Sequence, residues 1–117
     1  MTNLNKVLLM GRLTRDPQIS YLPSQTAVAE VGLAVNRKYK THNGEMKEEA
    51  NFFDCRAYGK IAETLKKNFE KGKAIFIEGR LKNDSWEDTE KKKHSKIRII
   101  IEKYGFVDSV KKETVEA

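Results

Sequence analysis

The sequence is poor in cysteine, proline and tryptophan. The shortage of cysteine bears on the compartment in which the protein functions. Of its 117 residues, one is cysteine, two are proline and one is tryptophan. A lone Cys55 cannot form an intramolecular disulfide, so nothing indicates an oxidising compartment. The sequence shows no signal-peptide pattern and no apolar run of membrane-spanning length. We therefore expect a cytoplasmic protein that has no membrane partner.

Residues suited to catalysis or metal binding are equally scarce. The two histidines, His42 and His94, lie in polar segments, and neither has a second ligand at metal-binding spacing. Cys55 alternates with Phe53 and Ala57, which indicates a core residue rather than a nucleophile. No glycine-rich phosphate loop of a common type occurs. We predict that the protein is not an enzyme and holds no metal or cofactor.

Positive charge is what the chain has in excess. Lysine and arginine number 23 against 17 aspartate and glutamate, which gives a net charge of +6 and an isoelectric point near 9.4. Fixed positive charge favours a polyanion partner because binding releases the counterions of the phosphates. Many basic proteins bind no polyanion, so charge alone leaves both interpretations open. The length fits one domain with a modest core.

Apolar residues alternate in five segments and recur every four residues in one, which predicts five strands and a short helix. The expected strands cover 6–13, 26–39, 51–59, 73–81 and 95–110, and the helix covers 60–72. Gly72 stands where a helix C-cap would. Both prolines fall in 15–26, an expected turn region, and Asn43-Gly44 indicates a hairpin. Residues 82–94 are expected to form a charged hairpin loop.

Five strands with one helix between the third and fourth is the order of the OB-fold, a five-stranded Greek-key barrel. The predicted class is therefore all-β with one short helix, and a small α+β sandwich is the alternative. The domain is expected to cover 1–110, followed by a charged, disordered end at 111–117. Gly11 inside the first strand indicates a bulge or a close backbone approach. Ile97, Ile99 and Ile101 should share one face of the last strand.

Four aromatic residues stand where an apolar core does not explain them: Tyr39, Phe52, Tyr58 and Trp86. Strand alternation in 51–59 points Phe53 inward and places Asp54 and Arg56, an expected surface ion pair, on the solvated face with Phe52. Bases of a single strand can cover such rings, and stacking contributes about 1–3 kcal/mol per base without sequence preference. The competing interpretations are Trp86 as a lid over the core and Phe52 in a subunit interface.

The segments "NKVLLMGRL", "YGKIAE" and "KGKAIFIEGRL", followed by Trp86, occur in an order and at a spacing that resemble the bacterial single-stranded DNA-binding protein family. The resemblance covers roughly Asn5 to Ser109. It implies an OB-fold domain that forms a homotetramer and associates with the nucleoid. It also implies a protein that coats and protects single-stranded DNA, without sequence preference, during replication, recombination and repair.

The resemblance also implies which side chains contact DNA. The stacking positions of the family fall on Tyr39, Phe52, Tyr58 and Trp86, and its basic contacts fall on Lys6, Lys60, Lys71 and Lys82. We add Arg56 from strand alternation. Asp54 and Asp84 occupy positions that are basic in some relatives, so those two contacts are not expected here.

Members of this family usually continue into a long flexible tail with an acidic, phenylalanine-terminated tip that recruits other proteins, whereas this sequence ends in "KKETVEA". Replication and repair proteins are therefore expected as partners only if the full-length product carries such a tail. Two alternatives remain open: a tail-less assembly protein of primosome type that docks other proteins, and an RNA-binding OB module.

Overall fold

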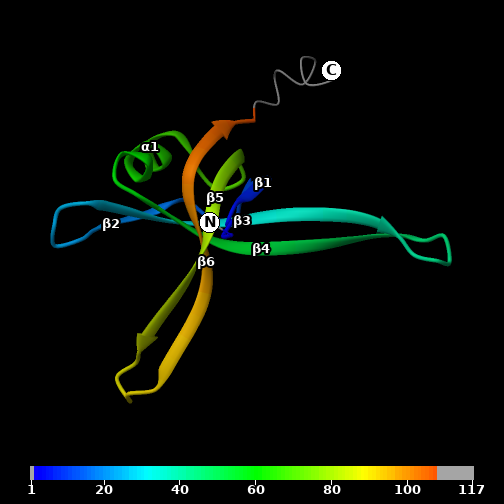
Figure 1. Cartoon of the computed structure of the whole chain (residues 1–117). Helices are drawn as coiled ribbons and strands as arrows, with labels where there is room; N and C mark the ends of the chain where they lie inside the picture. The colour runs from blue at the N-terminus through cyan, green and yellow to red at the C-terminus, as the bar shows by residue number, and fades with distance from the viewer. Residues whose placement is uncertain (1, 108–117) are drawn as a thin grey trace.

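The computed structural model describes residues 2–107 and consists mostly of strands with one helix (Figure 1). The elements in chain order are β1 (Val7–Leu13), β2 (Gln18–Tyr21), β3 (Ala27–Lys40), β4 (Met46–Tyr58), α1 (Lys60–Asn68), β5 (Ala74–Glu87) and β6 (Lys93–Phe106). The predicted fold class is thus confirmed. The end expected to be disordered, 111–117, and the last positions of the predicted fifth strand, 108–110, lie outside the described residues.

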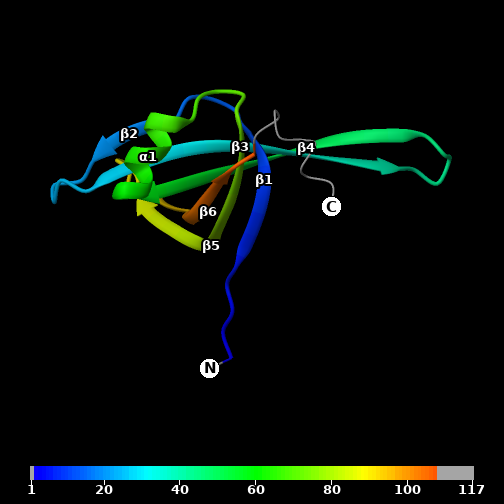
Figure 2. The same cartoon turned by 90° about the horizontal axis from the view of Figure 1, so that it is seen from above.

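Five of the strands close into a barrel. The order in the sheet is β1-β5-β6-β4-β3-β2, and an additional β1–β3 pairing joins the two sides of the ring. The parallel β4–β6 pairing is short, with Cys55 opposite Ile99 and Arg56 opposite Ile100. We call this pairing the β4–β6 seam. Helix α1 contacts β3 and β4 at one side of the barrel, which is visible from above in Figure 2. The arrangement confirms the OB-fold barrel and excludes the α+β sandwich.

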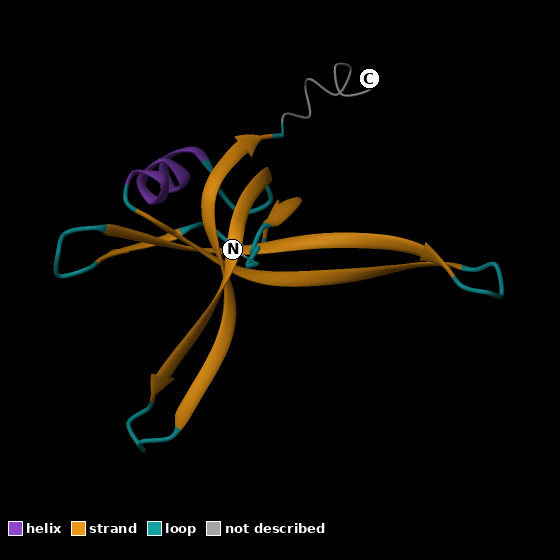
Figure 3. Cartoon of the chain, in the orientation of Figure 1, coloured by secondary structure: helices purple, strands orange, loops and turns teal. Residues whose placement is uncertain are grey.

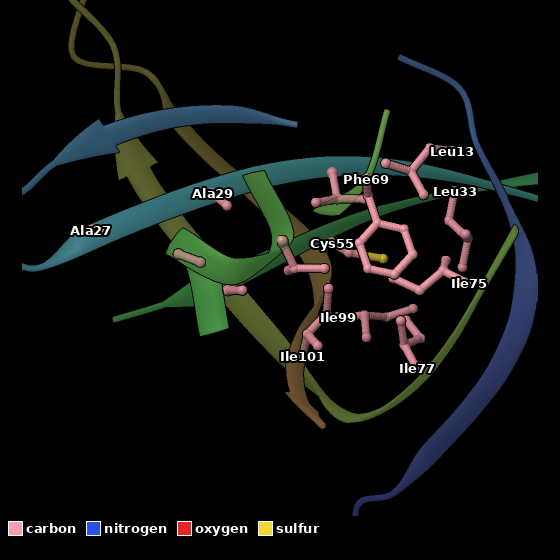
Figure 4. Close-up of a cluster of buried hydrophobic side chains, with 14 residues drawn as sticks. Leu13, Ala27, Ala29, Leu33, Cys55, Phe69, Ile75, Ile77, Ile99 and Ile101 are labelled. Carbon is pink, nitrogen blue, oxygen red and sulfur yellow. The ribbon is translucent and has the colours of Figure 1, made fainter. Parts of the chain in front are cut away.

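Alternation along the strands builds the core. Apolar side chains of every barrel strand and of α1 meet in one buried cluster (Figure 4), which includes Leu13, Val31, Leu33, Cys55, Leu65, Ile75, Ile77, Ile99 and Ile101. Full burial of one such aliphatic side chain stabilises the fold by about 1.5–3 kcal/mol. Burial also raises the pKa of the Cys55 thiol to about 12, so the thiol stays protonated at neutral pH. Cys55 is a core residue, as predicted.

Two glycines allow strands to approach closely. A Cβ atom added at Gly11 would lie 2.2 Å from the carbonyl oxygen of Ala34 on β3. One added at Gly79 would lie 2.1 Å from the carbonyl oxygen of Ile100 on β6, next to a register shift in the β5–β6 pairing. The close approach predicted at Gly11 is confirmed, and Gly79 is a second instance of the same constraint.

Both long hairpins extend well beyond their predicted strands, and Figure 3 shows them as two arms that project from the barrel. In the β3–β4 arm, continuous pairing reaches Lys40 opposite Met46. In the β5–β6 arm, pairing reaches Glu87 opposite Lys93. The predicted loop at 82–94 is therefore wrong except around its tip. Both faces of a two-stranded arm meet solvent, so the apolar alternation that reveals a strand is missing there.

Two smaller predictions are also wrong. The proposed turn region contains β2, which pairs with β3 and directs Ile19 against the core. The helix ends at Asn68, and Gly72, with φ +88°, lies in the turn that follows rather than at the C-cap. The prediction that Ile97, Ile99 and Ile101 share one face of the last strand is confirmed by their alternation in the β5–β6 pairing. Ile97 is nevertheless 61% exposed, because it lies where β6 leaves the barrel to form an arm.

Candidate nucleic-acid interface

We call the side chains of strands β3, β4, β5 and β6 that point away from the core the outer face. Its members come from alternate positions of each strand and include Glu30, Phe52, Asp54, Arg56, Tyr58, Lys82, Asp84, Trp86, His94, Lys96 and Arg98. Three of the four predicted stacking residues therefore lie on the same surface. They share it with four basic side chains of the barrel.

The assignment of the two neighbouring phenylalanines to opposite faces is confirmed. The side chain of Phe52 is 70% exposed on the outer face, whereas Phe53 is partly buried and packs against the core cluster. Tyr58, six residues further along β4, is 36% exposed. Large aromatic rings left open to solvent on a folded surface mark a binding site when they gather with charged groups.

Trp86 lies on β5 rather than in a loop, and it does not fold back over the core. It is 45% exposed, and its ring stacks on that of His94 with the centroids 5.6 Å apart and an interplanar angle of 20°. The Nε2 atom of His94 lies 2.8 Å from Oδ2 of Asp88 in the turn of the arm. The lid interpretation of Trp86 is therefore wrong.

Four charged residues form a connected network at the centre of the outer face. The Nε atom of Arg56 donates to Glu30 at 2.7 Å, and its Nη1 atom donates to Asp84 at 3.4 Å. Arg98 donates to Asp84 at 2.7 Å and lies 3.6 Å from Glu30. These side chains come from all four strands of the face. Two acids thus neutralise two arginines that would otherwise be available to phosphates.

The remaining basic residues of the outer face are also paired. Lys82 donates to Asp84 at 2.6 Å, and Lys96 forms an ion pair with Asp54. The expected Asp54–Arg56 pair is therefore wrong, because each residue has a partner on another strand. The hydrogen bond from Lys96 holds the pKa of Asp54 below its ordinary value, and that from Lys82, with Arg98, does the same for Asp84. Both carboxylates stay charged at neutral pH.

Two other predicted basic residues lie outside this network. Lys60 is the exposed first residue of α1, two positions after Tyr58. Lys71 is exposed in the turn between α1 and β5, where its backbone N–H donates to Asp16. Neither ammonium group has an ion-pair partner among the described residues. These two cations are therefore available to an incoming anion.

Lys6 and Tyr39 are separated from the centre of the outer face. Lys6 precedes β1 and pairs with Glu78 at 3.0 Å and Glu102 at 3.6 Å. Tyr39 lies far out on the β3–β4 arm, with the guanidinium of Arg37 5.2 Å from its ring centroid. In the register of the arm, Phe52 is opposite Ala34. Tyr39 is five residues from Ala34, so it lies on the other face of the arm from Phe52.

Sequence reasoning missed Arg15, His94, Lys96 and Arg98. The last two alternate with isoleucines in "KIRI", so strand alternation alone could have placed them outside. Arg15 covers Gly32 on β3, and its charge adds to that of Lys96 in lowering the pKa of Asp54. No sequence pattern signalled that contact.

Residues 2–107 contain neither a group of metal ligands nor a membrane-spanning helix. No three His, Cys, Asp or Glu side chains in 2–107 converge so that they could hold a metal ion. No helix in the same range is long and apolar enough to cross a membrane.

Comparison with known proteins gives consistent relatives. The model of the single-strand binding protein family matches residues 4–107. A single-stranded DNA-binding protein of Aquifex aeolicus is 51% identical over 97% of this chain and 77% of its own length. One of Helicobacter pylori is 42% identical over 89% of this chain, which spans 58% of that protein.

Two solved structures share the fold. A deletion mutant of the single-stranded DNA-binding protein of Thermus aquaticus superposes with a TM-score of 0.80 at 32% identity, over 91% of this chain and 51% of that one. A Plasmodium falciparum protein of the same type was solved in complex with single-stranded DNA. It superposes with a TM-score of 0.82 at 25% identity, over 92% of this chain and 98% of that one. The chain therefore belongs to the single-strand binding protein family, as the resemblance of its sequence implied.

Proposed function

We propose that the protein binds single-stranded DNA without sequence preference and coats it during replication, recombination and repair. The observation that carries this proposal is the exposure of Phe52, Tyr58 and Trp86 on one outer face that also carries four basic side chains. The family membership and the relative solved with single-stranded DNA support it. The activity is one of binding, without turnover of a substrate, and the proposed place of action is the cytoplasm, along the nucleoid.

The rings act as stacking platforms and the cations contact phosphates. Each stacked base contributes about 1–3 kcal/mol, which makes the three rings of the outer face the main source of affinity. Within residues 2–107 no carboxylate pairs with the ammonium groups of Lys60 and Lys71, so they are the first contacts for a phosphate. We place Tyr39 as a fourth platform, which a strand reaches by passing around the edge of the β3–β4 arm.

Basic residues that already have a carboxylate partner should contribute less to the salt dependence of binding than Lys60 and Lys71. A phosphate that reaches Arg56, Lys82 or Lys6 must compete with a carboxylate already in place. Little net charge is gained by such an exchange, so few counterions are released. Each phosphate that is neutralised contributes about −0.7 to the log–log salt slope on single strands. Binding should therefore depend only modestly on salt and persist in part at molar concentrations.

The proposed assembly is a homotetramer. Leu8 and Met10 are exposed on β1, and residues 8–11 pair with β5 on one side but with no described strand on the other. An open strand edge with exposed apolar side chains is a surface that proteins cover by association. Light scattering should give a particle four times the 13.5 kDa chain mass. A monomer in dilute solution would contradict the tetramer without affecting the DNA site.

The emission of Trp86, the single tryptophan, tests the proposed function. Addition of poly-dT should quench the emission strongly because a base stacks on the indole. Parallel titrations with RNA and duplex DNA, in competition with poly-dT, should give weaker binding. Tight binding of poly-dT with unchanged Trp86 emission would contradict stacking at this arm. Preference for RNA would favour an RNA-binding module instead.

A further inference from the structure

The ring of His94 covers one face of Trp86. The two residues are directly opposite each other in the β5–β6 arm, and their rings are 5.6 Å apart and nearly parallel. Each ring is close to half exposed. Trp86 therefore has one face occupied within the protein and one face open to a ligand.

Asp88 holds the imidazole in this position. Its Oδ2 atom lies 2.8 Å from Nε2 of His94, while its Oδ1 atom accepts the backbone N–H groups of Glu90 and Lys92. The backbone of the turn therefore holds the carboxylate of Asp88 in place, and the carboxylate holds the ring of His94. The contact with His94, followed by the backbone donors, lowers the pKa of Asp88, so the carboxylate is charged at neutral pH.

Apart from Asp88, the charges nearest His94 on the outer face are paired among themselves, whereas its neighbours Lys93 and Glu87 alternate to the opposite face of the arm. Lys96, two positions further along β6, pairs with Asp54 of β4. Asp84, two positions before Trp86 on β5, is shared by Lys82, Arg56 and Arg98. Of the acids on neighbouring elements, Asp88 alone makes an ion pair with His94 in the described structure.

We propose that His94 is a positioning residue for the DNA site, which orients the indole of Trp86 for one base and adds a positive charge beside it as the pH falls. This inference rests on the proposed function. Histidine is the side chain whose ordinary titration lies between pH 5 and 8. The neutral ring supports the indole by stacking, and the protonated ring also attracts the phosphate that follows the stacked base.

The first experiment uses the protein without DNA. Because an imidazolium in contact with an indole quenches its emission, Trp86 emission should rise as the pH is raised from 5 to 8. His42→Gln, which removes the other histidine at the tip of the β3–β4 arm, should titrate like the wild type. His94→Gln should show no such titration. If His94→Gln titrated like the wild type, the two rings would not be in contact and the proposal would fall.

The second experiment measures poly-dT affinity at pH 5.5 and pH 8. The wild type should bind roughly two- to fivefold more tightly at pH 5.5, the range for one added surface ion pair, with a salt slope steeper by about 0.7 per bound arm. His94→Gln should lose this difference. His94→Arg, which carries a permanent charge that can stack on the indole, should bind at pH 8 as the wild type does at pH 5.5.

The outcomes separate the inference from the proposed function. If poly-dT quenches Trp86 but the wild type and His94→Gln show the same pH dependence of binding, the role of His94 is wrong and the DNA site stands. If the wild type binds no poly-dT at either pH, both fall, even where the emission of the free protein titrates through His94.

Discussion

Arg56 and Arg98 donate to the same oxygen atom, Oδ2 of Asp84, at 3.4 and 2.7 Å. The two guanidinium groups come from β4 and β6, the strands that meet at the short β4–β6 seam. Two guanidinium groups that contact one oxygen atom repel each other, and the negative charge of the shared carboxylate offsets that repulsion. Asp84 therefore stabilises the closure of the barrel while it occupies two cations of the outer face.

Asp84→Asn should separate these two effects. The free energy of unfolding should fall by about 1–3 kcal/mol, because hydrogen bonds to a charged group in a mostly covered position are lost. Poly-dT binding at low salt should tighten, since Lys82 loses its ion-pair partner and the two arginines keep only Glu30 to neutralise them. Urea denaturation and fluorescence titration measure the two quantities.

The matched control for Asp84→Asn is Glu49→Gln, which breaks the exposed pair with Arg37 at 3.1 Å. Such pairs contribute at most about 1 kcal/mol, so stability should change little, and any gain in affinity measures the effect of removing one negative charge. Weaker DNA binding by Asp84→Asn would show that the carboxylate orients the arginines toward DNA rather than withholding them.

Phe52→Ala and Phe53→Ala apply one chemical change to opposite faces of β4. Phe52→Ala should leave the melting temperature nearly unchanged and weaken DNA binding by about 1–3 kcal/mol at one site. Phe53→Ala should lower stability by about 1–3 kcal/mol, less than the 3–5 of a fully buried phenylalanine, because Phe53 is only partly buried. Loss of folding by Phe52→Ala instead would place Phe52 in a subunit interface.

Stability should fall on acidification below about pH 4. Asp54 and Asp84 have pKa values lowered in the folded protein by Lys96 and by Lys82 with Arg98. A carboxylate whose pKa is lower in the folded state than in the unfolded state stabilises the fold at any pH above its unfolded-state pKa. This contribution is lost as the pH falls through the folded-state pKa. Thermal melting between pH 7 and pH 2.5 measures the loss. Asp54→Asn should show a shallower decline, and an identical decline would exclude the Asp54–Lys96 pair as a contributor.

Gly79→Ala should destabilise the barrel, whereas Gly105→Ala should not. A Cβ at Gly79 meets the backbone of Ile100 at 2.1 Å, but at Gly105 the nearest atom, on the ring of Phe76, is 3.8 Å away. Forcing apart two paired strands costs about 1–3 kcal/mol or more. Thermal melting of the two variants checks this, and equal melting temperatures would contradict the close approach of β5 and β6.

Alternation along a strand was enough to predict the barrel and its core, because one face of each strand is buried against the others. Phe53, Cys55 and Ala57 point inward for this reason, and Phe52 and Tyr58 outward. The same signal fails for the arms, where both faces are solvated, so Trp86 was expected in a loop. The charge network was not predictable for another reason: Arg56 of β4 reaches Asp84 and Arg98 only because β4 and β6 pair in parallel.

The order of the strands in the barrel has a consequence for how the chain folds. The β3–β4 and β5–β6 hairpins pair residues close in sequence, so each can form as soon as it has been synthesised. β1, in contrast, pairs with β5, and Val7 lies opposite Gly79. Its apolar residues must wait for most of the chain, and non-local pairing of this kind is slow. During translation residues 7–11 of β1 therefore have no strand partner until β5 emerges, which leaves this part of the strand open to misfolding.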